Sequence, residues 1–352
     1  MPPVSAPARD PLSSIEISVV VPTRQRRDLV LRLLGALREQ DLAMTAIEAV
    51  IAIDRSTDGT AEAVAEFPAP YRLLTVTPAR PGRAAACNEG IAASHGDVIL
   101  LLDDDMEPVE SCLRRHLQRH RGAARCCAIG AVPVRTDTNA PFVERYIAAR
   151  FESHLAKLSA PGHAFVLRDF YSGNASIRRA VLEEVGGFDE SFTVYGNEDL
   201  ELAFRLRRAG VELQFDPEAV AFQRYTKTFV ELERDNLAKG HTAVLLATTH
   251  PETFPELNLA HATGMSRRWR SVRSVLLAAA RSWPPSVEIV IRASAALERT
   301  GIGRARVFYA FVLDYLYWAG VTAALAEGAG EGSLGAVASE LQRGPIGLLL
   351  HG

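Results

Sequence analysis

Cysteine is scarce in this sequence, and the arrangement of the few cysteines excludes two classes of site. The 352 residues contain four cysteines, with no CxxC pair and no histidines at matching spacing. They are Cys87, Cys112, Cys126 and Cys127. A zinc site or a disulfide framework needs grouped cysteines, so neither is expected, and the pattern suits a reducing compartment. The sequence therefore predicts a cytoplasmic protein.

An excess of positive charge is also absent. Lysine and arginine together number 39 and aspartate and glutamate 42, which gives a net charge of −3 at pH 7. Nucleic-acid-binding proteins usually carry a basic surface that attracts phosphate groups, and this composition provides no such overall field. Nucleic acid is therefore not an expected partner.

A glycine-rich phosphate-binding loop is missing after the first predicted strand. Residues 15–21 predict that strand because most of them are β-branched, and Pro22 is expected to end it because proline cannot donate to a sheet ladder. The next residues, 23–26, contain neither glycine nor lysine. A nucleotidyltransferase on a similar sheet would need such a loop, so that class of enzyme ranks low.

The sequence does contain an alternation of strands and helices. Further strands are predicted at 47–53, 72–76 and 98–102, and helices over 28–40, after 56–60 and over 83–94. This alternation predicts an α/β fold with a mostly parallel, doubly wound sheet and helices on both faces. Beyond residue 120 the rhythm changes, with strands predicted at 126–134 and 170–177 and helices at 142–158, 179–185 and 198–209.

Three adjacent aspartates follow directly on the apolar run at 98–102. They are Asp103, Asp104 and Asp105. A run this apolar is typical of a parallel strand covered on both faces, and open α/β sheets bind ligands at the carboxyl ends of their strands. Adjacent carboxylates repel one another, and a hard divalent cation with oxygen ligands relieves that repulsion. We expect Mn²⁺ or Mg²⁺ on a diphosphate here; a solvated acidic turn is the alternative.

Several short motifs, in this order and at this spacing, resemble the family 2 nucleotide-sugar glycosyltransferases of the GT-A fold. They are residues 18–23, Asp54 with residues 56–60, Arg83 with Asn88 and Gly90, the three aspartates, residues 187–189 and residues 197–200. The resemblance implies a GT-A fold with a Rossmann-like sheet. It also implies inverting transfer of a sugar from a UDP-, GDP- or dTDP-linked donor to a hydroxyl acceptor in glycan, polysaccharide or glycolipid biosynthesis.

The resemblance assigns the nucleotide to the ends of the first strands. Asp54 could accept a hydrogen bond from the N–H of a pyrimidine base, while Pro22, Thr23 and Arg24 could line the base or ribose. Arg83 could bind a phosphate, because a guanidinium group matches phosphate oxygens in two-point contacts. The alternatives are that Asp54 caps a helix and that Arg83 is an exposed residue at a helix start.

The same resemblance assigns the metal to the acidic cluster. Asp105 is the stronger candidate ligand and Asp103 the second, with Asp103 or Asp104 reaching the ribose and the waters on the metal. One position departs from the family pattern. Gln223 stands where family members often have a histidine that touches the metal or diphosphate, and an amide is a poorer metal ligand than imidazole.

A pair of carboxylates at the start of the helix predicted at 198–209 supplies the candidate catalytic base. Asp199 resembles the second acidic residue of the family's Glu-Asp pair, and Glu198 is its rival. Asn197 is expected to cap this helix, whose dipole should keep Asp199 ionised at neutral pH. The alternatives are that both carboxylates only satisfy the helix terminus, or that the protein is a non-catalytic nucleotide-sugar-binding scaffold.

The acceptor is expected to bind in the second half of the same domain. Gly173 and Asn174 would form part of the floor of its site, and Glu198 could contact acceptor hydroxyls. Phe188 and Tyr195 could stack on a sugar, although both are more typical of a core. We therefore divide the chain into a disordered leader at 1–13, a nucleotide-sugar-binding half at 14–135, an acceptor-binding half at 136–250 and a helical extension at 251–352.

The helical extension raises the question of a membrane. Trp269, Arg270 and Arg273 combine cations with an aromatic ring as interfacial helices do, so a peripheral contact with anionic lipid is the alternative to a packed helix. Residues 306–325 form a long apolar stretch. A membrane span is disfavoured, because it would place the charged side chain of Asp314 near the middle of the bilayer. A helix packed on the rest of the protein or on the partner in a homodimer is favoured, and residues 328–335 are expected to form a flexible linker.

Overall fold

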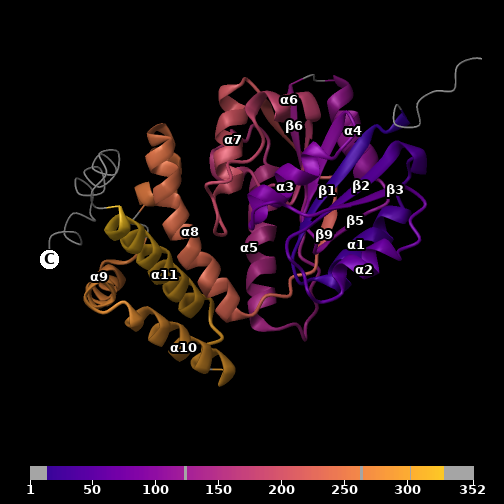
Figure 1. The fold of residues 1–352 in the computed structure, drawn as a ribbon. Helices are drawn as coiled ribbons and strands as arrows, with labels where there is room; N and C mark the ends of the chain where they lie inside the picture. The colour runs from indigo at the N-terminus through magenta and orange to yellow at the C-terminus, as the bar shows by residue number, and fades with distance from the viewer. Residues whose placement is uncertain (1–13, 123–124, 262–264, 302, 329–352) are drawn as a thin grey trace, which may run out of the picture.

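The structure, a computed structural model, describes residues 14–122, 125–261, 265–301 and 303–328. The leader expected at 1–13 and all but the first residue of the expected linker lie outside the described residues. A seven-stranded sheet forms the centre, in the order β3-β2-β1-β4-β7-β6-β8 (Figure 1). The strands are β1 (Ile17–Thr23), β2 (Ile47–Ile53), β3 (Arg72–Val76), β4 (Val98–Leu102), β6 (Cys126–Gly130), β7 (Asn174–Arg178) and β8 (Glu212–Asp216).

The sheet is mostly parallel, as predicted. β1 runs parallel to both β2 and β4, β2 runs parallel to β3, and β6 runs parallel to β8. β7 is antiparallel to β4 and β6, so it joins the two halves of the sheet. A second, two-stranded antiparallel sheet pairs β5 (Met106–Pro108) with β9 (Ala221–Gln223).

Helices cover both faces of the sheet, because successive residues of a strand point to opposite sides. Val19 of β1 packs in one apolar core with Leu33, whereas Val20 packs in the other core with Cys87. The first face is covered by α1 (Arg27–Arg38), α2 (Thr60–Ala65) and α4 (Cys112–Gly122). The second is covered by α3 (Arg83–Ala92), α6 (Arg179–Val185) and α7 (Glu198–Arg208).

Pro22 does not end the first strand, contrary to the prediction. β1 extends to Thr23 and pairs with β2 along its whole length, with Pro22 opposite Ala52. The pairing of β1 with β4 stops at Val20. Beyond that point one edge of β1 has no ladder to complete, so a proline without an N–H is tolerated there.

Two other predicted strands are shorter than expected. β6 ends at Gly130 rather than at residue 134, because the chain then leaves the large sheet and pairs with β9. Ala131 O accepts a hydrogen bond from Ala221 N at 3.0 Å, and Pro133 O accepts one from Gln223 N at 3.0 Å. β7 begins only at Asn174. The predicted bounds of β2, β3, β4, α6 and the helix α5 (Phe142–Leu158) are confirmed.

A layer of helices lies beside the sheet, with α5 (Phe142–Leu158) between the two (Figure 1). It contains α8 (Phe229–Thr249), α9 (Arg267–Ser282), α10 (Pro285–Arg299) and α11 (Arg306–Glu327). Short 3₁₀ helices lie at η2 (Met44–Ala46), η3 (Leu167–Asp169), η4 (Pro251–Glu256) and η5 (Asn258–His261). One apolar core contains residues of α5, α8, α9, α10 and α11. This core therefore continues across the domain boundary expected at residue 250.

The prediction that Trp269 and Arg273 face lipid is wrong. Arg273 is buried, and its Nη1 lies 2.9 Å from an Asp314 carboxylate oxygen. Trp269 donates from Nε1 to Asp314 at 2.8 Å and stacks on Phe311. Among the described residues, α11 is the helix long and apolar enough to cross a membrane, and 56% of its most apolar stretch is buried inside the protein. The polar side chain of Asp314 therefore holds α11 to α9.

Two glycines allow α8 and α11 to cross in close contact. A β-carbon built on Gly240 would lie 1.8 Å from Tyr317 O, and one on Gly320 would lie 2.0 Å from Leu237 O. No side chain fits at either distance. The close crossing therefore depends on the absence of a side chain at both positions.

We expect Gly240→Ala to lower the free energy of unfolding by about 2 kcal/mol, because the added methyl group forces the packed helices apart. Gly35→Ala is the matched control, since a β-carbon on Gly35 in α1 meets nothing within 4 Å. That change should stabilise the protein by up to ~1 kcal/mol through helix propensity. Thermal unfolding followed by circular dichroism compares them, and equal melting temperatures for Gly240→Ala and wild type would contradict this packing.

Candidate active site

The carboxyl ends of β1, β2 and β4 meet at one edge of the sheet, because the three strands are parallel neighbours. Thr23 ends β1, Asp54 directly follows β2, and the three aspartates directly follow β4. Thr23, Asp54, Asp104 and Asp105 are all buried. Ligands of open α/β sheets bind at this edge, so the structure places the predicted nucleotide and metal residues together.

Asp104 joins the acidic cluster to the first strand. One of its carboxylate oxygens accepts a hydrogen bond from Thr23 Oγ1 at 2.8 Å, and the other accepts one from Arg26 Nη1 at 3.0 Å. Burial raises the pKa of Asp104, while Arg26 and Thr23 oppose that rise. Both oxygens are therefore occupied within the protein, and a direct role of Asp104 toward the ribose stays a prediction.

Asp105 is the carboxylate best suited to hold a cation. Its Oδ2 accepts a hydrogen bond from Gln223 Nε2 at 3.2 Å and lies 3.6 Å from Arg26 Nη1. Its Oδ1 is buried and has no hydrogen-bond partner. Burial, together with the charges of Asp103 and Asp104, raises the pKa of Asp105 to about 7. A bound cation would satisfy the unpartnered oxygen and favour the ionised form.

The protein offers few ligands for such a cation. No group of three or more histidine, cysteine, aspartate or glutamate side chains converges anywhere in the described ranges. Mg²⁺ commonly binds through one or two carboxylates and completes its shell with water and phosphate oxygens. The residues around Asp105 therefore fit a cation shared with a diphosphate better than a cation held by protein alone.

Gln223, the departure from the family pattern, lies directly on the acidic cluster. Its amide nitrogen donates to Asp105, and its Oε1 is buried without a hydrogen-bond partner. The backbone of the next residue also contacts the cluster, since Arg224 N donates to Asp105 O at 2.8 Å. β9 therefore places an amide with an unpartnered oxygen next to Asp105, the residue proposed to bind a cation.

Asp54 holds the loop that precedes α3. Its Oδ2 accepts a hydrogen bond from Gly82 N at 3.0 Å, and its Oδ1 has no hydrogen-bond partner. Gly82 has a φ of +116°, which favours glycine. Gly59 is the N-cap of α2, so Asp54 is not the cap. Arg24, expected nearby, reaches to 4.0 Å from Asp54 with a largely exposed side chain.

Arg83 connects the acidic cluster to the start of α7. Its Nη2 lies 2.5 Å from Asp103 Oδ1, and its Nη1 lies 3.7 Å from Glu198 Oε1. Nη1 is buried and has no hydrogen-bond partner. Arg83 is therefore partly buried at the site and not an exposed residue at a helix start, and it has one donor available for a further acceptor such as a phosphate oxygen.

The start of α7 is fixed by contacts to α8. Asn197 does not cap the helix through its side chain, contrary to the prediction, and its φ is +62°. Its Nδ2 instead donates to Lys239 O at 2.9 Å and to Thr242 Oγ1 at 2.8 Å. Glu198 Oε2 accepts a hydrogen bond from Gly196 N at 2.9 Å. These contacts hold Glu198 and the residue after it in place.

The helix dipole was expected to keep Asp199 ionised at neutral pH, and this expectation is wrong. Burial and the charge of Glu198 raise its pKa to about 7, and they outweigh the opposing effects of Arg83 and Lys239. Its Oδ1 accepts a hydrogen bond from Leu200 N at 2.9 Å. A carboxylate with a pKa near neutrality is a stronger proton acceptor than an ordinary aspartate, which suits a general base.

The residues expected at the acceptor floor have different surroundings. Gly173 lies against the acidic cluster, because a β-carbon there would be 2.7 Å from Asp103 Oδ2. Asn174 is 0% exposed, and its Nδ2 donates to Ala131 O and Ala219 O. The side chain of Asn174 therefore fastens β7 to neighbouring segments and does not form a floor. Phe188 is in the core, whereas Tyr195 is 42% exposed.

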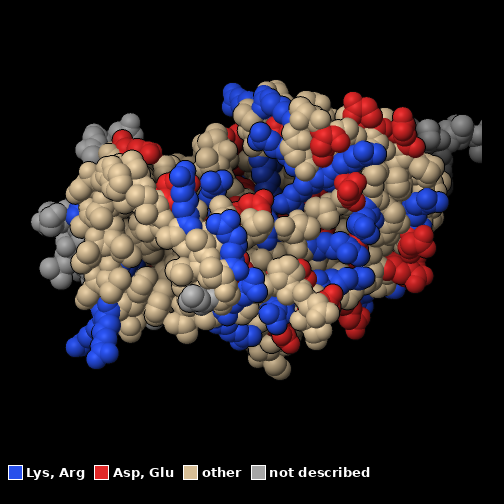
Figure 2. All heavy atoms as spheres, turned by 90° about the horizontal axis from the view of Figure 1, so that it is seen from below, with Lys and Arg blue, Asp and Glu red and all other residues tan. Residues whose placement is uncertain are grey.

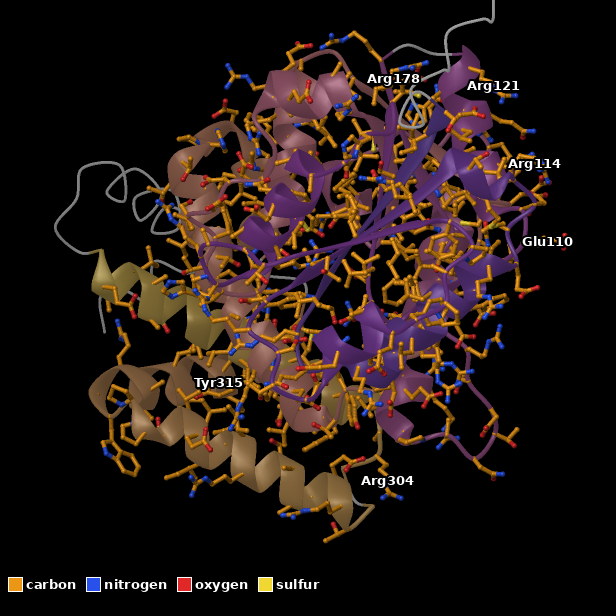
Figure 3. The ribbon with its side chains drawn as sticks, turned by 45° about the vertical axis from the view of Figure 1, so that its right-hand side comes forward. Glu110, Arg114, Arg121, Arg178, Arg304 and Tyr315 are labelled. Carbon is orange, nitrogen blue, oxygen red and sulfur yellow. The ribbon has the colours of Figure 1, made fainter. Side chains whose placement is uncertain are left out.

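His116, Asn174 and Ser176 form a buried polar cluster that holds α4 against β7. His116 of α4 bonds to Asn174 Oδ1 and to Ser176 Oγ, both at 2.9 Å, and burial lowers its pKa to about 4. Arg178 ends β7 beside the start of β4, at the opposite edge of the sheet from the acidic cluster. Figure 3 shows it near Arg121, on the side of the molecule formed by α4. The cluster keeps α4 on the sheet.

Sequence analysis missed two cations at the site. Arg26 contacts both Asp104 and Asp105, and Lys239 lies near Asp199. The position of Arg26 just after the first strand was a usable signal, whereas nothing in the sequence around Lys239 indicates a site. Figure 2 shows that lysine and arginine spread over the sheet half of the face seen from below, whereas few lie over the C-terminal helices.

The comparisons with known proteins agree with this geometry. The description "Glycosyl transferase family 2" matches residues 18–186, which include the three strand ends and Arg83. The chain belongs to glycosyltransferase family 2. A second description, "N-terminal domain of galactosyltransferase", matches residues 153–231, which include Glu198 and Asp199.

Curated relatives match about two thirds of this chain. Validoxylamine A glucosyltransferase from Streptomyces hygroscopicus subsp. jinggangensis is 27% identical over 271 residues, covering 68% of this chain and 62% of the relative. Pre-mycofactocin glycosyltransferase from Mycobacterium tuberculosis is 30% identical over 250 residues, covering 67% of this chain and 48% of the relative. The chain thus spans about half to three fifths of the length of these curated relatives.

A solved structure supports the fold. The mannosyltransferase from Pyrobaculum calidifontis, solved in complex with GDP-Man and Mn²⁺, is 21% identical, with a TM-score of 0.58. The match covers 91% of this chain and 90% of that one. The family 2 chain therefore has the GT-A glycosyltransferase fold.

Proposed function

We propose that this family 2 protein is an inverting glycosyltransferase that moves a sugar from a nucleoside-diphosphate sugar to a hydroxyl acceptor. One observation carries the proposal: Arg83 connects the acidic cluster after β4 to the carboxylates at the start of α7. Asp105, with its buried unpartnered oxygen, lies at one end, and Asp199 lies beside Glu198 at the other. The names of the relatives and the GDP-Man in the solved neighbour support a nucleotide-sugar donor in glycan, polysaccharide or glycolipid synthesis.

The donor would bind across the strand ends. Thr23 and Asp54 stand at the ends of β1 and β2, where Pro22 and Arg24 can line the base or ribose. Asp105 would hold Mn²⁺ or Mg²⁺, with Asp103 as second ligand. The Mn²⁺ in the solved neighbour supports the metal. When bound, this cation supplies positive charge that offsets the diphosphate.

Residues of this chain then supply the remaining chemistry. Asp199 accepts the proton of the acceptor hydroxyl as its oxygen attacks the anomeric carbon from the face opposite the diphosphate. The bond from that carbon to the diphosphate oxygen breaks, and the nucleoside diphosphate leaves with the electron pair. Arg83 can donate from Nη1 to a phosphate oxygen. Glu198, which accepts a hydrogen bond from Gly196 N, would contact acceptor hydroxyls.

Asp199→Asn is expected to lower kcat by about 100-fold or more with little change in the KM for the donor, because the amide cannot take the proton. In the wild type the rate should rise with pH and level off above about pH 7, since Asp199 must be ionised to act and its pKa is about 7. Rates of nucleoside diphosphate release are measured after screening UDP-, GDP- and dTDP-sugars. Near wild-type rates in Asp199→Asn with loss in Glu198→Gln would assign the base to Glu198.

We further propose a cytoplasmic protein that contacts the inner face of a membrane through the outer faces of α9 and α10. Exposed apolar residues repeat at helical spacing on these faces, with many arginines and two acidic residues on the same helices. The exposed residues are Val272 and Val275 on α9, Ile289 and Leu297 on α10, and Trp283 between the two helices. Basic charge around an apolar face fits an anionic lipid surface. A homodimer that buries this face is the alternative.

Val275→Asp should weaken binding to vesicles of anionic phospholipid, because it places a negative charge in the apolar face. Val194→Asp is the matched control, since Val194 is an exposed valine in the catalytic part of the chain. Cosedimentation with vesicles at low and high salt measures both. Absence of binding at low salt, with a dimer detected by analytical ultracentrifugation, would assign the face to a homodimer.

A further inference from the structure

Arg26 places a positive charge beside Asp105, the carboxylate proposed to hold a cation. Its Nη1 lies 3.0 Å from Asp104 Oδ1 and 3.6 Å from Asp105 Oδ2. Burial alone would lower the pKa of Arg26, but the charges of Asp104, Asp105 and Asp103 raise it overall. A guanidinium group stays charged in proteins, so a divalent cation at Asp105 would meet this positive charge at short range.

The backbone on both sides of Arg26 is fixed. Its carbonyl oxygen accepts a hydrogen bond from Val30 N at 3.1 Å, at the start of α1. The preceding residue, Gln25, has a φ of +56° and donates from N to Ser56 Oγ at 2.9 Å and from Nε2 to Thr57 Oγ1 at 2.8 Å. These contacts tie the loop after β1 to the loop after β2. Arg26 therefore reaches the acidic cluster from a fixed backbone, and its side chain is only 28% exposed.

The charges at the acidic cluster are balanced unequally. Arg83 pairs with Asp103 at 2.5 Å, one cation for one carboxylate. Arg26 faces two carboxylates, those of Asp104 and Asp105, so one negative charge remains when both are ionised. A divalent cation would more than neutralise this remaining charge and leave a positive excess among buried groups, where water screens charge weakly. The negative charges of a diphosphate would restore the balance.

The carboxylate oxygens at this place are also largely occupied. Both oxygens of Asp104 already accept hydrogen bonds, one from Thr23 and one from Arg26. Asp105 Oδ2 accepts a hydrogen bond from Gln223 and lies near Arg26, whereas Asp105 Oδ1 has no hydrogen-bond partner. A cation that arrives without nucleotide would therefore find one unpartnered oxygen on these two aspartates. Oxygens of a diphosphate would supply the missing ligands.

We propose that Arg26 couples the binding of the cation to the binding of the nucleotide. Arg26 serves as an internal cation of the acidic cluster, so Mn²⁺ or Mg²⁺ binds tightly only together with the diphosphate. This inference rests on the proposed function, because it uses the cation and the diphosphate assigned to Asp105. Arg26 acts through the aspartates and is therefore a positioning residue. The coupling is reciprocal, so nucleotide and cation strengthen each other's binding by the same factor.

A structural role is the alternative, in which Arg26 only fastens the loop after β1 to the acidic cluster. Loss of Arg26 would then destabilise the protein without increasing its affinity for Mn²⁺. Under the proposed coupling, loss of the charge makes Asp104 and Asp105 available, and Mn²⁺ binds more tightly in the absence of nucleotide. Electron paramagnetic resonance of free Mn²⁺ measures this affinity without any turnover.

Wild type is titrated with Mn²⁺ alone and with an excess of UDP, GDP or dTDP in separate samples. At least one of these nucleotides should tighten Mn²⁺ binding by about tenfold or more. Arg26→Gln keeps a hydrogen-bond donor for Asp104 but lacks the charge, so it should bind Mn²⁺ alone at least about tenfold more tightly than wild type. Arg26→Lys keeps the charge and should bind Mn²⁺ alone as weakly as wild type.

Arg27→Met is the matched control, because Arg27 is the next arginine in the chain and its side chain is exposed. Its Cδ would lie 4.0 Å from a β-carbon on Gly59, the N-cap of α2. This variant should leave both Mn²⁺ affinities unchanged. Equal affinity of wild type for Mn²⁺ with and without nucleotide would overturn the coupling, and an unchanged affinity in Arg26→Gln would assign Arg26 the structural role. Absence of Mn²⁺ binding with every nucleotide would contradict the metal of the proposed function itself, and the coupling with it.

Discussion

Repulsion among the three aspartates after β4 is the constraint on which this site depends. Their backbone is fixed by the strand, so the carboxylates cannot move apart, and two of them are buried. Arg26 and Arg83 offset part of the charge, at Asp104 and at Asp103. Asp105 keeps an unpartnered oxygen and a pKa of about 7. The apoprotein is therefore destabilised at this edge as Asp105 ionises, and a cation with its diphosphate would remove that cost.

The rest of the architecture places a second carboxylate opposite this cluster. β7 joins the two halves of the sheet, and Arg83 spans from Asp103 to Glu198. The start of α7 rests on α8 through Gly196 and Asn197. α8 in turn crosses α11 at two glycines, so the helical layer supports the proposed base. The C-terminal helices thus contribute to the site without lining its donor end.

Much of the fold could be predicted from the sequence, and the limits have physical causes. Apolar runs placed β2, β3 and β4 correctly, and the polar residues after them indicated the site. Asn174 was misassigned because its partners, Ala131 and Ala219, come from distant segments that no local pattern connects. The helix dipole suggested an ionised Asp199, but burial beside Glu198 decides its pKa. Partners supplied by tertiary packing leave no periodic signal in the sequence.

The most direct test of this account is calorimetric titration of UDP with Mn²⁺ or EDTA. Wild type should bind UDP about tenfold or more tightly with Mn²⁺, and more tightly at pH 8 than at pH 6, because Asp105 must lose its proton to bind the cation. Asp105→Ala should lose this dependence on Mn²⁺. Asp41→Ala, which removes an exposed pair with Arg114, should keep it. Equal UDP affinity in Mn²⁺ and EDTA for the wild type would contradict the central claim.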